Sequence, residues 1–246
     1  MQQDSSTQSW NNISEEWCEI APVNETRQYF IMPYMLRLMG DVSGKRILDL
    51  GCGEGGYARE LTRRGAEVVA IDCAAYSIEY AKKQSLIERV EIQHYVRNSN
   101  DLYGVENCSF DIVLCSMMLM DCEDLEGTVK EIRRVLKSNG KLFASVLHPC
   151  FTGKNIGREG KGINRRVIVE DYFSPREYSQ TLPGGNVEVV WRHRTFEEYV
   201  KLFVKSRLQI IDLNEGRPTE EESNVSVPIK WLNKIPLFLF WELEKN

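Results

Sequence analysis

A glycine-rich loop after a short apolar run is the feature that most constrains the fold of this chain. The loop reads Asp49-Leu50-Gly51-Cys52-Gly53-Glu54-Gly55-Gly56 and separates an expected strand, 46–50, from an expected helix, 57–64. Glycines at such a junction let the backbone turn sharply and approach a ligand closely. Asp72 ends the next apolar run, where a carboxylate can accept hydrogen bonds from both hydroxyls of a ribose. Together the two features indicate an adenosine-containing cofactor.

Apolar runs alternate with helical patterns along most of the chain. Further strands are expected at 67–71, 90–95, 110–116, 141–147, 208–216 and 236–244, and further helices at 75–84, 125–136 and 196–205. This alternation is typical of βαβ units, in which helices cover both faces of a parallel sheet. We therefore predict an α/β fold, a Rossmann-like three-layer αβα sandwich with a seven-stranded, mostly parallel sheet whose last strand is antiparallel.

The same pattern divides the chain into four parts. Residues 1–44 form an N-terminal helical lid segment, of which the first ~20 residues are polar and are read as a lid or a frayed tail. Residues 45–148 form the cofactor-binding core, and residues 194–246 form its C-terminal part. Between them, 149–193 is an inserted substrate cap. There the runs RVIVEDY and NVEVVW flank a turn at Pro183-Gly184-Gly185, which predicts one hairpin.

Composition and charge exclude several classes of partner. The net charge is -5, from 31 basic and 36 acidic side chains, and no basic stripe is visible, so a nucleic-acid partner is not expected. Seven cysteines without a CxxC pair indicate free thiols in a reducing compartment and no metal site. The N-terminus is polar and no apolar run is long enough to span a bilayer. We expect a cytoplasmic monomer or homodimer that acts on a small molecule, with no membrane partner.

The glycine loop is compatible with two cofactors. Gly51, Gly53 and Gly56 also satisfy G-x-G-x-x-G, the pattern of dehydrogenases that bind NAD. A pyrophosphate on the helix N-terminus would be repelled by Asp49 and by Glu54 within the loop. Two carboxylates instead suit a cofactor that carries an ammonium and a sulfonium group, as S-adenosyl-L-methionine (SAM) does.

Three blocks of sequence carry a resemblance to a known family. The segment RILDLGCGEGGYARELTRRGAEVVAIDCA resembles motif I and the following acidic strand of class I SAM-dependent methyltransferases, where the pattern is D/E-x-G-x-G-x-G. FDIVLCSMMLMDCED is similar to the family's fourth-strand motif, and EIRRVLKSNGKLFASV to its next helix, turn and fifth strand. The order and spacing of the blocks match across about 45–147. The chain looks most like the small-molecule, type 11-like members.

The resemblance implies where the cofactor, and its product S-adenosyl-L-homocysteine (SAH), would bind. Asp49, Gly51, Cys52 and Gly53 would line the methionine moiety, Asp72 would hold the ribose hydroxyls, and Cys73 would lie next to the adenine. Asn98 and Ser99 follow the third strand and would meet the adenine amino group, unless the alignment slips to Asp101. Cys115 and Ser116, which end the fourth strand, would lie under the methionine end.

Methyl transfer to a hydroxyl requires an aligned nucleophile and removal of its proton. His148 directly follows the fifth strand and is either a general base or a structural histidine at a strand end. His193 lies between Arg192 and Arg194, at the point where the insertion rejoins the core. Tyr29 belongs to an N-x-x-R-x-Y segment like that of the small-molecule subgroup. It either closes over the ligands or packs within the first helix.

The sequence thus predicts methyl transfer from SAM to a small molecule, with oxygen as the expected acceptor atom and nitrogen or sulfur open. Arginines of the insertion and its junction offer an anionic acceptor a binding site, or else are solvated surface: Arg158, Arg165, Arg166, Arg192 and Arg194. The alternatives are a SAM-binding protein without catalysis, an NAD-dependent oxidoreductase, and an RNA or protein methyltransferase. The last would need a basic face or an appended recognition domain, and the sequence indicates neither.

Overall fold

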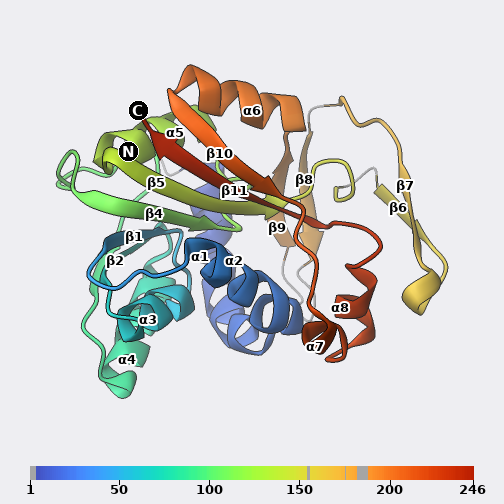
Figure 1. Cartoon of the computed structure of the whole chain (residues 1–246), viewed down its shortest axis with the longest axis horizontal. Coiled ribbons are helices and arrows are strands. Elements are labelled where there is room, and N and C mark those ends of the chain that lie inside the picture. The colour runs from blue at the N-terminus through green and yellow to red at the C-terminus, as the bar shows by residue number, and fades with distance from the viewer. Residues whose placement is uncertain (1–3, 154–155, 175, 182–187) are drawn as a thin grey trace.

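The computed structural model describes residues 4–153, 156–174, 176–181 and 188–246. Its centre is a seven-stranded sheet in the order β10-β11-β5-β4-β1-β2-β3 (Figure 1). The strands are β1 (Arg46–Leu50), β2 (Glu67–Asp72), β3 (Gln93–Val96), β4 (Phe110–Ser116), β5 (Leu136–Leu147), β10 (Leu208–Asn214) and β11 (Phe238–Lys245). β1 to β5 pair in parallel, and β11 runs antiparallel to both β5 and β10. The predicted sheet, with its antiparallel last strand, is confirmed.

Helices cover both faces of the sheet (Figure 1). One face carries α2 (Met32–Met39), α3 (Gly56–Arg63) and α4 (Ala75–Glu88), and the other carries α5 (Leu125–Val135) and α6 (Phe196–Lys205). Each face has its own buried apolar cluster, because strands that are covered on both sides bury alternate side chains in opposite directions. The predicted three-layer sandwich is confirmed.

The N-terminal residues form a helix across the carboxyl ends of the strands. In α1 (Ser5–Ile20) the carboxylate of Asp4 caps the first turn by accepting from the Thr7 amide, and Ile13 and Cys18 are fully buried. A 3₁₀ turn, η1 (Ala21–Val23), and a π-helical turn, η2 (Arg27–Ile31), lead into α2. The alternative of a frayed tail is therefore wrong, because isolated apolar side chains in a polar segment already give this helix a buried face.

The insertion after β5 contains two hairpins. β6 (Ile156–Glu159) pairs with β7 (Arg166–Val169) around η3 (Gly162–Asn164), and β8 (Arg176–Thr181) pairs with β9 (Glu188–His193). The expected pairing of RVIV with VEVVW is wrong. Gly160 and Gly162, with φ of 81° and 55°, allow a local turn that returns the chain to β6 first. The expected turn at 183–185 lies outside the described residues. Two short helices, α7 (Glu220–Ser223) and α8 (Val227–Trp231), precede β11.

Candidate active site

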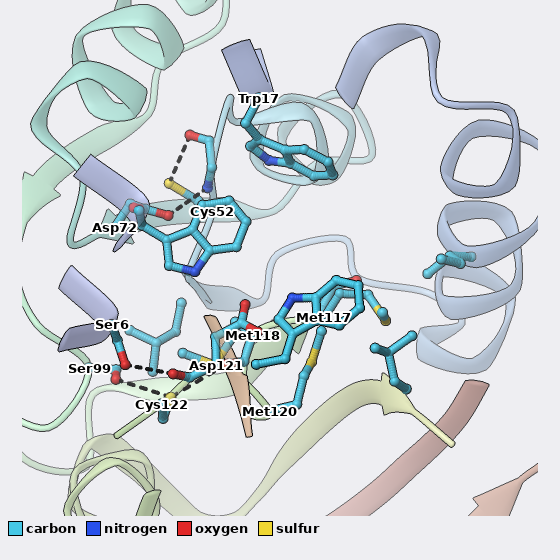
Figure 2. A pocket seen from close by; sticks show the side chains of 18 of the residues that line it. Ser6, Trp17, Cys52, Asp72, Ser99, Met117, Met118, Met120, Asp121 and Cys122 are labelled. Carbon is cyan, nitrogen blue, oxygen red and sulfur yellow. Dashed lines mark hydrogen bonds between the residues drawn. The ribbon is translucent and has the colours of Figure 1, made fainter. Parts of the chain in front are cut away.

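A cavity of about 720 Å³ lies at the carboxyl ends of β1, β2 and β4, beneath α1. This is where ligands bind in doubly wound sheets, because strand ends and loops converge there. Figure 2 shows Trp17 and Asp72 on one side of it, with methionines of the loop after β4 facing them. The cavity is lined by nine of the ten predicted cofactor residues: Asp49, Gly51, Cys52, Gly53, Asp72, Cys73, Asn98, Ser99 and Ser116. Cys115 is fully buried in the core behind this wall.

The glycine loop approaches its neighbours more closely than a side chain would allow. Gly51 has φ of 74°, and a Cβ there would lie 2.8 Å from the Cβ of Met118. Gly53 has φ of 53°, and a Cβ there would lie 3.3 Å from the indole nitrogen of Trp17. Both positions therefore need glycine for conformation and for space. The bare backbone of this loop forms the floor of the cavity.

Asp72 ties the glycine loop to the next helix. Its carboxylate accepts from the Gly53 amide and from the Ala74 amide, both at 2.8 Å. Burial raises the pKa of Asp72, and the two amide donors oppose that shift. Binding of ribose hydroxyls at this residue stays a prediction.

Asp49 is an acid of the loop with an unpaired carboxylate oxygen. The residue is 2% exposed, it lines the cavity, and its Oδ2 has no hydrogen-bond partner among the described residues. Burial raises its pKa to about 7, and the nearby charge of Arg27 opposes the shift. A buried carboxyl with an unpaired oxygen is complemented by a ligand that brings a positive charge or a donor.

Glu54 differs from the sequence expectation. Its buried carboxylate forms ion pairs with Arg27 at 2.6 Å and with Arg59 at 2.7 Å, and it accepts from the Gly56 amide. Two guanidinium groups neutralise this acid, so the prediction that it repels a pyrophosphate is wrong. Arg27 itself lines the cavity. Arg27 is the arginine of the N-x-x-R-x-Y segment, from which the sequence analysis selected only the tyrosine, Tyr29.

Helix α1 supplies cavity residues that sequence reasoning did not select. The amide nitrogen of Asn98 donates to Asp4 at 2.5 Å and to Thr7 at 3.0 Å, which holds α1 against the loop after β3. The amide oxygen of Asn98 accepts from the Asn100 backbone at 3.3 Å. The cavity lining also includes Asp4, Ser6, Thr7, Trp10 and Trp17. Two tryptophans in an otherwise polar segment were the available signal.

The loop after β4 is fixed by arginines that follow each other closely at the end of β9. Arg192 donates to the carbonyl of Asp121 at 2.5 Å, which also accepts from the Ser6 hydroxyl at 2.6 Å. Arg194 donates to the carbonyls of Leu119 and Met120 at 3.2 and 3.3 Å, and also to that of Cys122. These two of the five arginines are therefore structural clamps.

Asp121 projects from this clamped loop into the cavity (Figure 2). The residue is 4% exposed, and its Oδ1 has no hydrogen-bond partner among the described residues. Burial raises its pKa well above the ordinary value, against a hydrogen bond from Trp10 and the nearby charge of Arg192. A buried acid of this kind is a candidate for proton transfer.

The three predicted catalytic residues, His148, His193 and Tyr29, do not line the cavity with Asp121 in the described chain. His148 is buried: its Nε2 lies 3.0 Å from Glu215, and its Nδ1 accepts from the Cys150 amide at 3.1 Å. Burial lowers the pKa of His148. The Nε2 of His193 lies 2.7 Å from a backbone carbonyl, and Tyr29 is 49% exposed. None of the three is among the cavity-lining residues of the described chain, and their catalytic roles stay predictions.

Comparisons with known proteins decide the family. The profile described as a methyltransferase domain matches residues 48–144. The ubiquinone biosynthesis O-methyltransferase of Xanthomonas oryzae pv. oryzae is 37% identical over 155 residues, which cover 61% of this chain and 65% of that protein. The protein of the same name from Xylella fastidiosa is 34% identical over 168 residues, which cover 62% and 68%. The chain belongs to the class I SAM-dependent methyltransferases.

A solved structure supports the same fold over a longer range. A SAM-dependent methyltransferase from Mesorhizobium loti superposes with a TM-score of 0.75 and 21% identity, over 92% of this chain and all of that chain. The first curated relatives are matched over only 65% of their length. SAM is the cofactor of the family, and the cavity fits it at two points: the close-approaching glycine loop and the unpaired oxygen of Asp49.

Proposed function

We propose that this methyltransferase transfers the methyl group of SAM to a hydroxyl oxygen of a small-molecule acceptor. The observation that carries the proposal is one continuous cavity that joins the glycine loop to the buried carboxyl of Asp121. When bound, SAM supplies an electrophilic methyl group on a positively charged sulfur. The names of the curated relatives, which are O-methyltransferases, support oxygen as the acceptor atom.

The cofactor end of the cavity offers complementary groups for the positive charges, the ribose and the carboxylate of SAM. Asp49 would face the positive charges, and Asp72 would accept from the ribose hydroxyls. Arg27 is the guanidinium beside the loop and would meet the carboxylate of the cofactor. Helix α1, with Trp10 and Trp17, would then act as a lid, as the sequence proposed for residues 1–44.

On the acceptor side, Asp121 is the group we assign to proton removal. Asp121 would take the hydroxyl proton as the acceptor oxygen bonds to the methyl carbon, and the sulfur released from that carbon would leave in SAH. The positive charge of the cofactor would favour the ionised carboxylate in this buried setting. Met117, Met118 and Met120 line the cavity and would form an adaptable apolar wall around the acceptor.

Other expectations belong to this proposal without a test of their own. Residues 149–193 would act as the substrate cap. Cytoplasmic location is supported by the cysteines, all seven of which are free thiols. Among the described residues, no helix is long and apolar enough to cross a membrane.

Calorimetry with SAM, SAH and NAD tests the cofactor first. We expect both SAM and SAH to bind, and binding of NAD alone would contradict the proposal. A mass-shift screen of hydroxylated metabolites then identifies an acceptor. SAM binding without any product from the panel would favour a non-catalytic SAM-binding protein.

Once an acceptor is known, Asp121→Asn tests the base in single-turnover experiments. Loss of general-base catalysis should slow methyl transfer by roughly 10²-fold or more. The wild-type rate should rise with pH through the raised pKa of Asp121, because only the ionised form accepts the proton, and the variant should lose that dependence. His148→Ala is the parallel variant: a normal rate there would leave the histidine structural.

A further inference from the structure

Two arginines of the insertion line the same cavity as the glycine loop, at the end formed by the β6–β7 hairpin and α8. They are Arg158 on β6 and Arg165, which immediately precedes β7. Figure 1 shows this hairpin on the opposite side of the molecule from α3 and α4. The chain therefore places positive charge at the acceptor end of the cavity, away from the residues proposed for the cofactor.

Arg165 is held in position by Trp231 of α8. Its guanidinium lies 4.0 Å from the centre of the Trp231 ring, and its backbone carbonyl accepts from the indole nitrogen at 3.0 Å. The Nε of Arg165 is nevertheless buried without a hydrogen-bond partner among the described residues. A fixed, desolvated donor that lacks an acceptor indicates a group that a ligand completes.

Arg158 lies at the open rim of the same region. Partial burial and the like charge of Arg165 lower its pKa. Within the described ranges, neither arginine forms an ion pair, although the chain has 36 acidic side chains and Arg192 pairs with Glu177 at 2.9 Å. Two neighbouring cations without a counter-charge repel each other, and a bound anion would reverse that cost.

The cavity between these arginines and Asp121 has apolar walls. They are formed by Trp191 of β9, by Leu232 after α8 and by Phe238 of β11. We propose, on the basis of the proposed methyl transfer, that the acceptor carries a carboxylate or phosphate group held by Arg158 and Arg165. An apolar body would span the walls and present the hydroxyl to Asp121. The hairpin would thus select anionic acceptors over neutral ones of the same shape.

Matched fragment pairs test the charge requirement by saturation-transfer NMR. The probes are a set of small phenolic carboxylic acids, each with its neutral carboxamide, and phenyl phosphate, all against the SAH-saturated full chain. We expect the acids or the phosphate to bind about tenfold more tightly than the amides, which corresponds to about 1.4 kcal/mol, because charge-assisted hydrogen bonds are stronger than neutral ones. A preference for phosphate over carboxylate would identify which oxyanion the site takes. Acids that bind no better than amides, or no anion binding at all, would overturn the proposal.

Variants locate the binding to the two arginines. Arg158→Gln and Arg165→Gln should each remove most of the preference for anions. Arg166→Gln is the matched control, because this exposed neighbour is not part of the cavity lining in the described chain. An anion preference that survives in both Gln variants, or that Arg166→Gln removes equally, would contradict the assignment. Arg158 is exposed, so its variant stays informative even if loss of the Trp231 contact impairs folding of Arg165→Gln.

SAH affinity, measured by calorimetry on the same samples, separates the two proposals. Failure of SAH to bind would reject the proposed cofactor, while selective anion binding would still support the arginine site. Normal SAH binding without selection for anions would reject the arginine site and leave the methyl transfer standing.

Discussion

The glycine-loop side and the hairpin side of the cavity use their charged side chains in different ways. Around the loop, Glu54 is paired with two arginines, and both oxygens of Asp72 hold backbone amides. On the other side, Asp121 has an unpaired oxygen and Arg165 an unpaired nitrogen. Apart from the unpaired Oδ2 of Asp49, the charged groups of the loop therefore have partners without a ligand, whereas neither of these groups on the acceptor side is fully paired. The loop side is thus held in shape by contacts within the protein, whereas the acceptor side has polar groups that a ligand would pair.

The largest expected effect tests how much the ion pairs of Glu54 on the loop side contribute to stability. Glu54→Gln removes the shared partner of Arg27 and Arg59 and leaves two guanidiniums facing each other in a buried site. Breaking such a buried pair costs about 3–5 kcal/mol of the free energy of unfolding. Urea denaturation measures the loss.

Glu60→Gln is the control for that experiment. Glu60 pairs with Arg63 and Arg64 on the surface of α3, where the arginine side chains are 48% and 42% exposed. Such pairs contribute roughly 0–1 kcal/mol. Equal losses in the two variants would show that the Glu54 network is no more than a surface ion pair, and the contrast between the two sides would weaken.

The second prediction concerns cofactor affinity at Asp72. Asp72→Ala should weaken SAH binding by about 10-fold or more, from loss of charge-assisted hydrogen bonds of about 1.5–3 kcal/mol. Calorimetry measures the change. Asp101→Ala is the control, because that alternative position does not line the cavity within the described residues. A larger loss at Asp101 would mean that the loop side binds the adenosine elsewhere.

The loop side was also the more predictable one. Gly51, Gly53 and Asp72 lie within 22 residues of each other, and local spacing predicts their conformation and their place at the strand ends. The sheet and its layers followed from the same local periodicity. What spacing could not give was Glu54: its partners include Arg27, which precedes it by 27 residues and is brought in by a π-helical turn.

The acceptor side depends on contacts between distant segments. Asp121 points into the cavity because Ser6 and Arg192, 115 and 71 residues away, bind its carbonyl. Residue spacing does not encode such contacts, so the sequence offers His148 as a general base or a structural histidine and does not indicate Asp121. The structure places that ring against Glu215 and the Cys150 amide, with both nitrogens engaged. The predicted pairing of RVIV with VEVVW was wrong for the same reason, because the sequence of a strand does not specify which neighbouring strand it pairs with.

The smallest expected effect concerns Asp49, which, unlike Glu54 and Asp72, has an unpaired carboxylate oxygen on the loop side. Because burial raises its folded-state pKa from 3.8 to about 7, the stability that its protonated form contributes is fully present below pH 4. It is lost as pH rises through about 7.

A cofactor with positive charges favours the ionised form of Asp49 instead, so SAM binding should tighten over the upper part of the same pH window. From pH 6 to 7 the ionised fraction rises about fivefold, and from pH 7 to 8 less than twofold. Calorimetric SAM affinity relative to Asp49→Asn isolates this change, because titration of the cofactor itself is common to both proteins. If the ratio does not vary with pH, Asp49 does not face the positive charge of the cofactor, and Asp72 would then be the acid of the loop side that contacts the ligand.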